Sequence, residues 1–258
     1  MHDAGNAMKH RDKALVILSG GQDSTTCLFW ALEQFKEVYA VTYNYGQRHI
    51  RELQAARDVV SLAGRVLEHQ VITVGAILQG ASPLVSSNEL EQYPDMHSLP
   101  GGLEKTFVPG RNLLFLTLAA NHAYARGILN LVTGVCEEDF GGYPDCRKVF
   151  IDAAQQAIRM GFGYDDNDRF AELEIHTPLM FKSKSESVHM ARMMPSCWTA
   201  LAFTHTAYDG QYPPVGNDHA TLLRAKGFAE ANLPDPLVLR AVEEGLMQLP
   251  DAPNYRHQ

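Results

Sequence analysis

The segment that most constrains the fold is a buried strand that runs directly into a glycine-rich loop and then into a helix. Residues Ala14–Leu18 form a short, continuously apolar run, which is typical of a strand covered on both faces. The loop Ser19–Thr25 follows, and apolar residues then recur at helical spacing over Thr25–Gln34. In an open parallel sheet, a loop in this position lies at the carboxyl end of the strand, where ligands bind.

The same alternation of strand and helix continues along the chain. The pattern predicts further strands at Val38–Thr42, Val71–Val74, Leu129–Val135 and Leu173–Ile175. It predicts helices at Ile50–Ala63, Asn112–Arg126, Arg147–Met160 and Ser183–Met193. Ser183 is the expected N-cap of the last of these helices. Strands separated by helices pair in parallel with right-handed crossovers, so we expect an α/β fold with a doubly wound parallel sheet.

The two ends of the chain differ from this middle part. Residues 1–12 have no apolar run, so we expect a disordered tail there and no signal peptide. Residues 13–196 carry the alternating pattern and form the expected main domain. After Pro195 the pattern changes, and residues 197–258 are expected to form a small C-terminal appendage. This appendage has a loop followed by two helices, at Ala200–Pro214, His219–Glu230 and Pro236–Gln248.

The composition indicates a globular protein and bears on which kind of substrate it binds. The 258 residues are 45% hydrophobic and 20% charged, which is ordinary for a globular protein, and the formal net charge is -8. An acidic surface repels nucleic acid, so we expect a small-molecule substrate unless a local basic patch overrides the net charge. The longest apolar stretch, Asn112–Ala125, is too short to cross a membrane. The four cysteines form no CxxC pair, and the chain is expected in the cytoplasm.

The loop has the residues that hold a phosphate. Glycines let the backbone approach an anion, and the N–H groups at the start of the following helix attract it. Hydroxyls of Ser19, Ser24 and Thr25 can donate hydrogen bonds, and the carboxylate of Asp23 can hold Mg²⁺ beside the phosphates. No lysine follows the glycines, so this is neither a Walker GxxxxGK[ST] loop nor a GxGxxG loop. A tight strand–helix turn with an N-cap is the alternative interpretation.

The run SGGQDS at residues 19–24 resembles the SGGxDS signature of the PP-loop ATP pyrophosphatases. That superfamily has an adenine-nucleotide hydrolase-like fold and cleaves ATP between the α- and β-phosphates. The cleavage adenylates a carbonyl or carboxylate oxygen, which a nitrogen or sulfur nucleophile then displaces. The resemblance implies that ATP and Mg²⁺ bind here and that Asp23 is catalytic. The expected nucleotide-binding residues are Leu18, Ser19, Gly20, Gly21, Gln22, Asp23, Ser24, Thr25, Tyr45 and Gln47.

Downstream segments narrow the resemblance and occur in a consistent order from about residue 13 to 194. They are Tyr43–His49, Phe107–Phe115, Gly134–Arg147 and His176–Met180, followed by Lys184 and Glu186. All are similar to the QueC family of 7-cyano-7-deazaguanine synthases. The resemblance implies an ATP-dependent ligase of queuosine biosynthesis, which converts 7-carboxy-7-deazaguanine and ammonia to the nitrile through an adenylated carboxylate and an amide. It also implies a homodimer.

Adenylation brings a carboxylate onto the α-phosphate, so positive charge must neutralise the site. The candidates besides Mg²⁺ are Arg111, Arg147, Lys182 and Lys184, and we assign Arg111 and Lys184 as catalytic. Arg111 lies at the start of a predicted helix, where the partial positive charge of the helix dipole does not stabilise a cation. This favours a functional role, although an ordinary ion pair is the alternative. A guanidinium is also suited to a bidentate grip on a carboxylate or phosphate.

Neighbouring polar and aromatic residues are candidates for holding the two bases. A carboxylate among Glu137, Glu138 and Asp139 can accept hydrogen bonds from a guanine-like edge, although a solvated acidic loop is an equal alternative. Tyr143 can stack on the deazapurine, and Tyr45 with Gln47 can hold the adenosine, although single aromatic residues more often pack in the core. The expected substrate-binding residues are Arg111, Asn112, Glu137, Asp139, Tyr143 and Arg147.

The chain departs from the family near its C-terminus. The synthases that it resembles hold a structural zinc with four cysteines, in a TCYNG segment and a CGxCxxC segment. Here the corresponding positions carry Ala207, Val215, Asp218 and Thr221. Tetrahedral zinc needs four N or S donors, so we expect no zinc site, and His205, Asp218 and His219 are better interpreted as surface polar residues. Packing around Tyr208, Tyr212, Pro213 and Pro214 is expected to replace the metal.

Two other functions stay open on the sequence. One is a nucleotide-binding homologue without catalysis, against which the intact loop, Arg111 and Lys184 argue. The other is a PP-loop enzyme that adenylates a related deazapurine or a tRNA, such as a thiolase that carries sulfur on two cysteines. Cys136 and Cys146 are better interpreted as buried small hydrophobic residues. The segment Ser82–Lys105 has no clear period, and our hypothesis for it is a lid over the active site.

Overall fold

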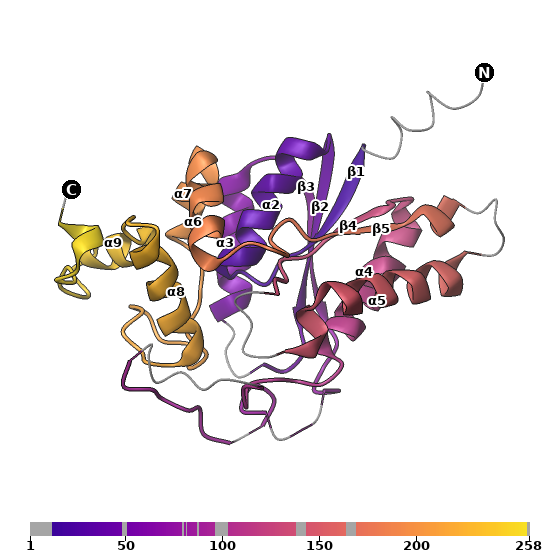
Figure 1. Ribbon diagram of the computed structural model, residues 1–258. Helices are drawn as coiled ribbons and strands as arrows, with labels where there is room; N and C mark the ends of the chain where they lie inside the picture. The colour runs from indigo at the N-terminus through magenta and orange to yellow at the C-terminus, as the bar shows by residue number, and fades with distance from the viewer. Residues whose placement is uncertain are drawn as a thin grey trace.

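In the computed structural model, which describes residues 12–47, 51–78, 80, 82–86, 88–95, 103–137, 143–163 and 169–256, five parallel strands form one sheet (Figure 1). The strands are β1 (Lys13–Ile17), β2 (Glu37–Asn44), β3 (Val66–Thr73), β4 (Asn130–Val132) and β5 (Glu174–His176). They lie in the order β3-β2-β1-β4-β5. In chain order, β2 and β3 extend the sheet on one side of β1, and β4 and β5 then extend it on the other side. The predicted fold, a doubly wound parallel α/β sheet, is confirmed.

Helices cover both faces of the sheet (Figure 1). One face packs against α2 (Gln22–Gln34), α3 (Arg51–Ala63), α6 (Lys184–Met193) and α7 (Pro195–Leu201). The other face packs against α4 (Arg111–Arg126) and α5 (Lys148–Phe162). Ala14 and Val16 belong to the first core and Leu15 to the second. Successive side chains of a strand point to opposite faces, so a strand covered on both sides must be apolar at every position.

Two strands, β3 and β4, differ most from the predicted bounds. β3 begins at Val66 rather than Val71, because it is an edge strand whose first residues face solvent, and Leu67 is 59% exposed. A half-exposed edge strand has no continuous apolar run to mark its start. β4 ends at Val132 rather than Val135, although the N–H of Thr133 still donates to the carbonyl of His176 at 3.0 Å.

The C-terminal segment shares the core of the sheet. α7 begins at Pro195, where the sequence indicated only a break in the pattern, because proline is well suited to the first position of a helix. Cys197 and Leu201 of α7 are fully buried in the first core. The predicted domain boundary at residue 197 therefore falls inside a helix that packs on α2 and α3.

The last two helices extend away from the sheet at the left of Figure 1. α8 (His219–Glu230) has the bounds expected from the sequence, and its Phe228 is buried in the first core. α9 (Pro236–Glu243) ends before the predicted Gln248, because Gly245 turns the chain with a φ of +71°. Of the predicted tail, residues 1–11 lie outside the described residues. Within the described part of the chain, every helix is too short or too polar to cross a membrane.

Candidate active site

The loop after β1 is held by hydrogen bonds among its own residues. The N–H of Ser19 donates to Ser24 Oγ at 3.2 Å, the two serine hydroxyls lie 3.0 Å apart, and the N–H of Gly21 donates to Ser19 Oγ at 3.3 Å. Gly21 is the N-cap of α2, and no side chain caps this helix end. The first turn of α2 therefore presents backbone N–H groups and a helix dipole to an anion.

Two close backbone approaches explain the glycines around the loop. Gly20 has a φ of +84°, and a Cβ there would lie 2.4 Å from the carbonyl oxygen of Glu52 in α3. A Cβ on Gly134, which follows β4, would lie 2.9 Å from the backbone N of Ser24. On a third side, the N–H of His205 donates to the carbonyl of Gly20 at 2.9 Å. The loop thus packs between α3, the residues after β4 and the C-terminal segment. This packing requires glycine at positions 20 and 134.

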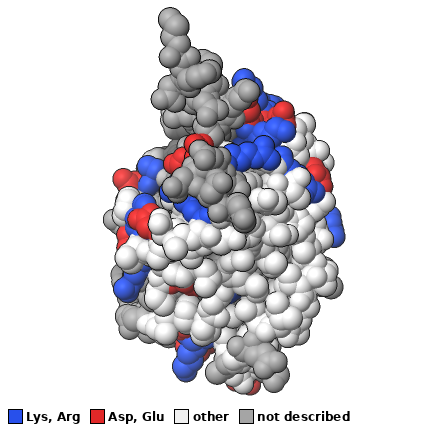
Figure 2. Space-filling view, turned by 90° about the vertical axis from the view of Figure 1, so that its right-hand side faces the viewer, with Lys and Arg blue, Asp and Glu red and all other residues white. Residues whose placement is uncertain are grey.

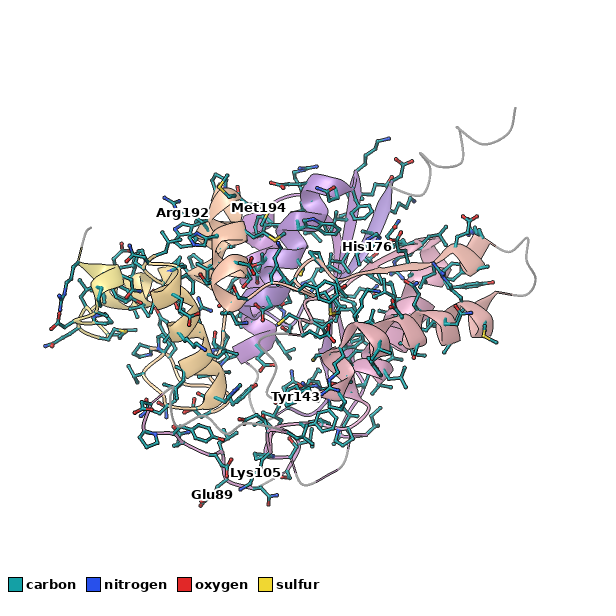
Figure 3. All side chains as sticks on the ribbon, viewed as in Figure 1. Glu89, Lys105, Tyr143, His176, Arg192 and Met194 are labelled. Carbon is teal, nitrogen blue, oxygen red and sulfur yellow. The ribbon has the colours of Figure 1, made fainter. Side chains whose placement is uncertain are left out.

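A cavity of about 360 Å³ opens against this loop at the carboxyl ends of the strands. It brings together most of the site residues predicted from the sequence, which are Leu18, Ser19, Gly21, Gln22, Asp23, Ser24, Tyr45, Gln47, Arg111, Asn112, Tyr143 and Lys184. Figure 3 shows Tyr143 below the carboxyl ends of the strands, above the segment that carries Lys105. The predicted residues Gly20 and Thr25 do not line the cavity, and Thr25 is fully buried.

A buried donor in the loop lacks an acceptor. Gln22 is 6% exposed and lines the cavity, and within the described part of the chain its Nε2 has no hydrogen-bond partner. An unsatisfied buried amide costs roughly 1–3 kcal/mol, so this position suits an incoming acceptor. A phosphate oxygen at the N-terminus of α2 would satisfy it, and the loop therefore fits a nucleotide phosphate chain.

Lys184 faces the loop from the start of α6. Its Nζ donates to both carboxylate oxygens of Asp23, at 2.8 and 3.1 Å. The predicted N-cap before it is confirmed, since Ser183 and Glu186 form a capping box. From α8, Gly227 lies so close that a Cβ there would be 2.2 Å from Lys184 Cγ. The lysine stem is therefore held between two helices, with its charge beside a carboxylate able to bind Mg²⁺.

Arg111 is the first residue of α4, as the sequence predicted, and follows Gly110, which has a φ of +76°. Burial by itself lowers the pKa of the guanidinium, but three tyrosine hydroxyls and a carboxylate outweigh this effect and raise it. These groups belong to Tyr45, Tyr208, Tyr143 and Asp145. Arg111 is therefore a permanent buried cation in the cavity wall, available to a substrate carboxylate or phosphate.

Comparisons with known proteins agree over most of the chain. Residues 13–232 match the family described as "Queuosine biosynthesis protein QueC". The chain is 48% identical over 227 residues to a 7-cyano-7-deazaguanine synthase of Gloeobacter violaceus, covering 87% of this chain and 95% of the relative. It is 49% identical over 236 residues to one of Chromobacterium violaceum, covering 90% and 96%. The chain belongs to the QueC family.

Solved structures similar to this QueC chain are more distant. A 4-thiouridine synthetase in complex with RNA and bound ATP is 17% identical, with a TM-score of 0.46, covering 91% of this chain and 53% of that one. A structure of NMN synthetase from Francisella tularensis is 13% identical, with a TM-score of 0.39, covering 97% and 84%. These likenesses are too distant to bear on function.

Three of the predicted substrate-binding residues are not part of the cavity wall that the structure describes. Glu137 follows β4, but it is not among the residues that line the cavity, and its N–H donates to the carbonyl of Met180 at 2.8 Å. Arg147 is exposed at the N-cap of α5, also away from the cavity wall. Asp139 lies outside the described residues.

The two cysteines that suggested a thiolase are both in the cavity wall. Burial, with a further contribution from Asp145, raises the pKa of the Cys146 thiol to about 12. The Nδ2 of Asn112 donates to its sulfur at 3.5 Å. A thiol with so high a pKa stays protonated at neutral pH and is a poor nucleophile, which agrees with a packing role.

Two of the positions at which zinc ligands were considered, Asp218 and Thr221, form the N-terminal cap of α8 in this QueC chain. Asp218 is buried, and its Oδ1 accepts from the N–H groups of Ala220 and Thr221 at 3.1 and 3.2 Å, which caps α8. Thr221 Oγ1 donates to the other oxygen of Asp218 at 2.7 Å. The described residues contain no cluster of three or more His, Cys, Asp or Glu that could hold a metal ion. These donors do not fit a zinc ion.

Glu52 is one of the ionisable groups in the cavity wall that sequence reasoning missed. Glu52 lies in the first turn of α3 and lines the cavity. Burial raises the pKa of its carboxyl to about 7, against a smaller opposing effect of Arg111. The sequence shows Glu52 as an acidic residue in the first turn of a helix that follows a strand. Acidic residues are common in the first turn of any helix, so this position did not distinguish Glu52 as a site residue.

Gly227→Ala is expected to separate Lys184 from Asp23. The added methyl group overlaps the lysine stem, so the variant should lose about 1–3 kcal/mol of unfolding free energy by overpacking and should also bind ATP more weakly. Urea denaturation and calorimetric titration with ATP measure the two effects.

Gly161→Ala in α5 is the matched control, since a Cβ there meets nothing within 4 Å. That variant should keep the ATP affinity and gain up to about 1 kcal/mol of stability. Wild-type stability and affinity in the Gly227 variant would contradict the assigned packing.

Proposed function

We propose that the chain is an ATP-dependent ligase that converts 7-carboxy-7-deazaguanine and ammonia to 7-cyano-7-deazaguanine. The supporting observation is the near full-length similarity to relatives named 7-cyano-7-deazaguanine synthase, at 45% to 49% identity. The cavity supports it independently, because it combines an anion-binding helix end with two cations, Arg111 and Lys184. Those are the groups that carboxylate adenylation requires.

In the first step, a carboxylate oxygen of the substrate attacks the α-phosphorus of ATP, and pyrophosphate leaves. The loop residues Ser19, Gly21, Gln22 and Ser24 hold the phosphates, and Tyr45 with Gln47 contacts the adenosine. Asp23 would hold Mg²⁺, which would screen the phosphate charge, and Lys184 neutralises charge that builds up as the pyrophosphate leaves. Arg111, Asn112 and Tyr143 hold the substrate, so that the two anionic reactants meet beside fixed positive charge.

In the second step, ammonia attacks the carbonyl carbon of the adenylate, AMP leaves, and one proton is released with the amide. The amide oxygen then attacks a second ATP, and pyrophosphate leaves again. Loss of AMP and of the remaining N–H protons gives the nitrile. The same loop serves both activations, because each transfers an adenylyl group to an oxygen on the same carbon.

The chain is also proposed to work without zinc. In place of a metal, a buried ion pair joins Arg224 of α8 to Asp235 at the start of α9, and the same guanidinium bonds to the segment before α8. The Nε and Nη2 of Arg224 donate to the carboxylate of Asp235 at 2.6 and 2.8 Å, and Nη1 donates to Thr204 and Thr206 at 2.7 and 2.9 Å. Both charged side chains are nearly fully buried. The guanidinium thus joins three polypeptide segments that a metal would otherwise cross-link.

A homodimer is proposed by similarity to the family. The side of the molecule that includes α4 and α5 shows few charged side chains across its centre (Figure 2). Leu113, Tyr124, Val149 and Met160 are exposed on these two helices. A surface with few charged side chains and several exposed apolar ones suits a protein partner better than a nucleic acid, which needs a basic face. Light scattering that gives the mass of one chain would contradict the dimer.

Mass spectrometry of a reaction with 7-carboxy-7-deazaguanine, ATP and ammonium tests the assigned reaction. The nitrile and its amide precursor are the expected products. Arg111→Gln should lower kcat/KM for the carboxylate roughly 10- to 100-fold, because a charged hydrogen bond is lost. Arg147→Gln is the matched control and should retain activity, since Arg147 is outside the cavity wall. Absence of both products would contradict the substrate assignment.

Metal analysis of the purified chain should find no zinc above the buffer background, and a chelator should leave the melting temperature unchanged. Arg224→Leu should cost about 3–5 kcal/mol of stability, because it leaves Asp235 buried without its partner. Lys226→Leu removes an exposed pair with Glu230 on the same helix and should cost at most about 0.5 kcal/mol. Stoichiometric zinc, or equal stability of the two variants, would contradict the proposal.

A further inference from the structure

Two carboxylates line the cavity within the described part of the chain, and they differ in their partners. Asp23 is bound by Lys184 through both of its oxygens. Glu52 forms no ion pair or side-chain hydrogen bond with any described residue. Arg111 acts on this carboxyl without forming an ion pair with it, so no cation of the described residues is bound to Glu52 directly. A carboxylate in this position can bind a cation from solution.

The backbone fixes the place of Glu52. Its carbonyl oxygen is the atom that prevents a side chain at Gly20, so the first turn of α3 lies directly on the phosphate loop. The charged and titratable groups that act on its carboxyl are Arg111 of α4 and Tyr45 of the turn after β2. Glu52 is therefore next to both the phosphate loop and the cation proposed to hold the substrate carboxylate.

The proposed reaction, on which this inference rests, needs a proton acceptor. At neutral pH ammonia is almost entirely ammonium, which has no lone pair and cannot attack a carbonyl carbon. The ion must first be bound and then deprotonated within the cavity. A base for this task works best when it titrates near the working pH.

We propose that Glu52 binds the ammonium ion and takes its proton. The carboxylate holds the cation beside the adenylated carbon and accepts one proton, which gives neutral ammonia and the carboxylic acid. The nitrogen lone pair then forms the C–N bond as the C–O bond to AMP breaks. A proton from the new C–NH₃⁺ group passes to solvent, and Glu52 returns its own proton to solvent before the next cycle.

The chemistry of the carboxyl agrees with this role. Burial raises its pKa to about 7, so an appreciable fraction is ionised and able to bind a cation at neutral pH. Arg111 partly opposes the shift by favouring the ionised form. Asp145 is a poorer candidate, because it is not among the cavity-lining residues and its Oδ2 accepts from the N–H of Asn112 at 3.4 Å.

The test compares ammonium with hydroxylamine, a weaker base that is largely unprotonated at neutral pH and needs no deprotonation. In Glu52→Gln, amide formation from ammonium should fall roughly 10²- to 10⁴-fold, as expected for loss of a general base. Pyrophosphate release in the first turnover and hydroxamate formation from hydroxylamine should stay within a few-fold of wild type. Asp58→Asn, on the same helix but outside the cavity, is the control and should leave all three rates unchanged.

Thermal melts at two pH values check the fold of the variant. The raised pKa means that the wild type loses stability between pH 4.5 and about 7, as the buried carboxyl ionises. Glu52→Gln has no carboxyl to ionise and does not lose this stability. The melting temperature of the variant relative to that of the wild type should therefore be higher at the higher pH.

The possible results separate the two proposals. Equal losses with ammonium and hydroxylamine, or full activity with ammonium, would overturn the role of Glu52 while pyrophosphate release by the wild type still supports adenylation. Failure of the wild type to release pyrophosphate with the deazaguanine carboxylate would instead contradict the proposed function and, with it, this inference.

Discussion

The active site depends on how closely the backbone packs around one loop. Gly20 lies against the carbonyl of Glu52, and Gly134 lies against the first turn of α2, at separations that exclude a Cβ. The hydrogen bond from His205 to Gly20 closes the third side. These backbone contacts, together with the hydrogen bonds that the two serine hydroxyls make within the loop, fix the loop at the N-terminus of α2. A preorganised anion site of this kind does not have to reorder when a phosphate binds.

The charges around the loop follow from that packing. α6 and α8 together hold Lys184 beside Asp23, and α4 begins with Arg111 among three tyrosines. Both cations line the cavity, where their effect on a developing anion is stronger than in bulk water. The C-terminal segment contributes to this arrangement directly, since Gly227 contacts Lys184. Asp218 and Thr221 therefore lie on an element that the site needs, and the buried Arg224–Asp235 pair helps to hold that element in place.

Local signals in the sequence were enough to predict much of this structure. β1 is apolar from Ala14 to Ile17 because this part of the strand is covered on both faces. Ser183 caps α6 because serine followed three residues later by glutamate forms a capping box. The SGGQDS run, Arg111 and Lys184 were found in the same way and all reach the cavity except Gly20. The edge strand β3, the helix α7 and the roles of Gly227 and Glu52 could not be found locally. Each depends on a contact between segments far apart in the sequence.

The central claim is that this loop directs cleavage of ATP between the α- and β-phosphates, and phosphorus NMR tests it most directly. A reaction of the purified chain with ATP, Mg²⁺, 7-carboxy-7-deazaguanine and ammonium should show the resonances of AMP and pyrophosphate growing in equal amounts. These resonances should not grow when the carboxylate substrate is left out. Resonances of ADP and inorganic phosphate in their place would contradict the account.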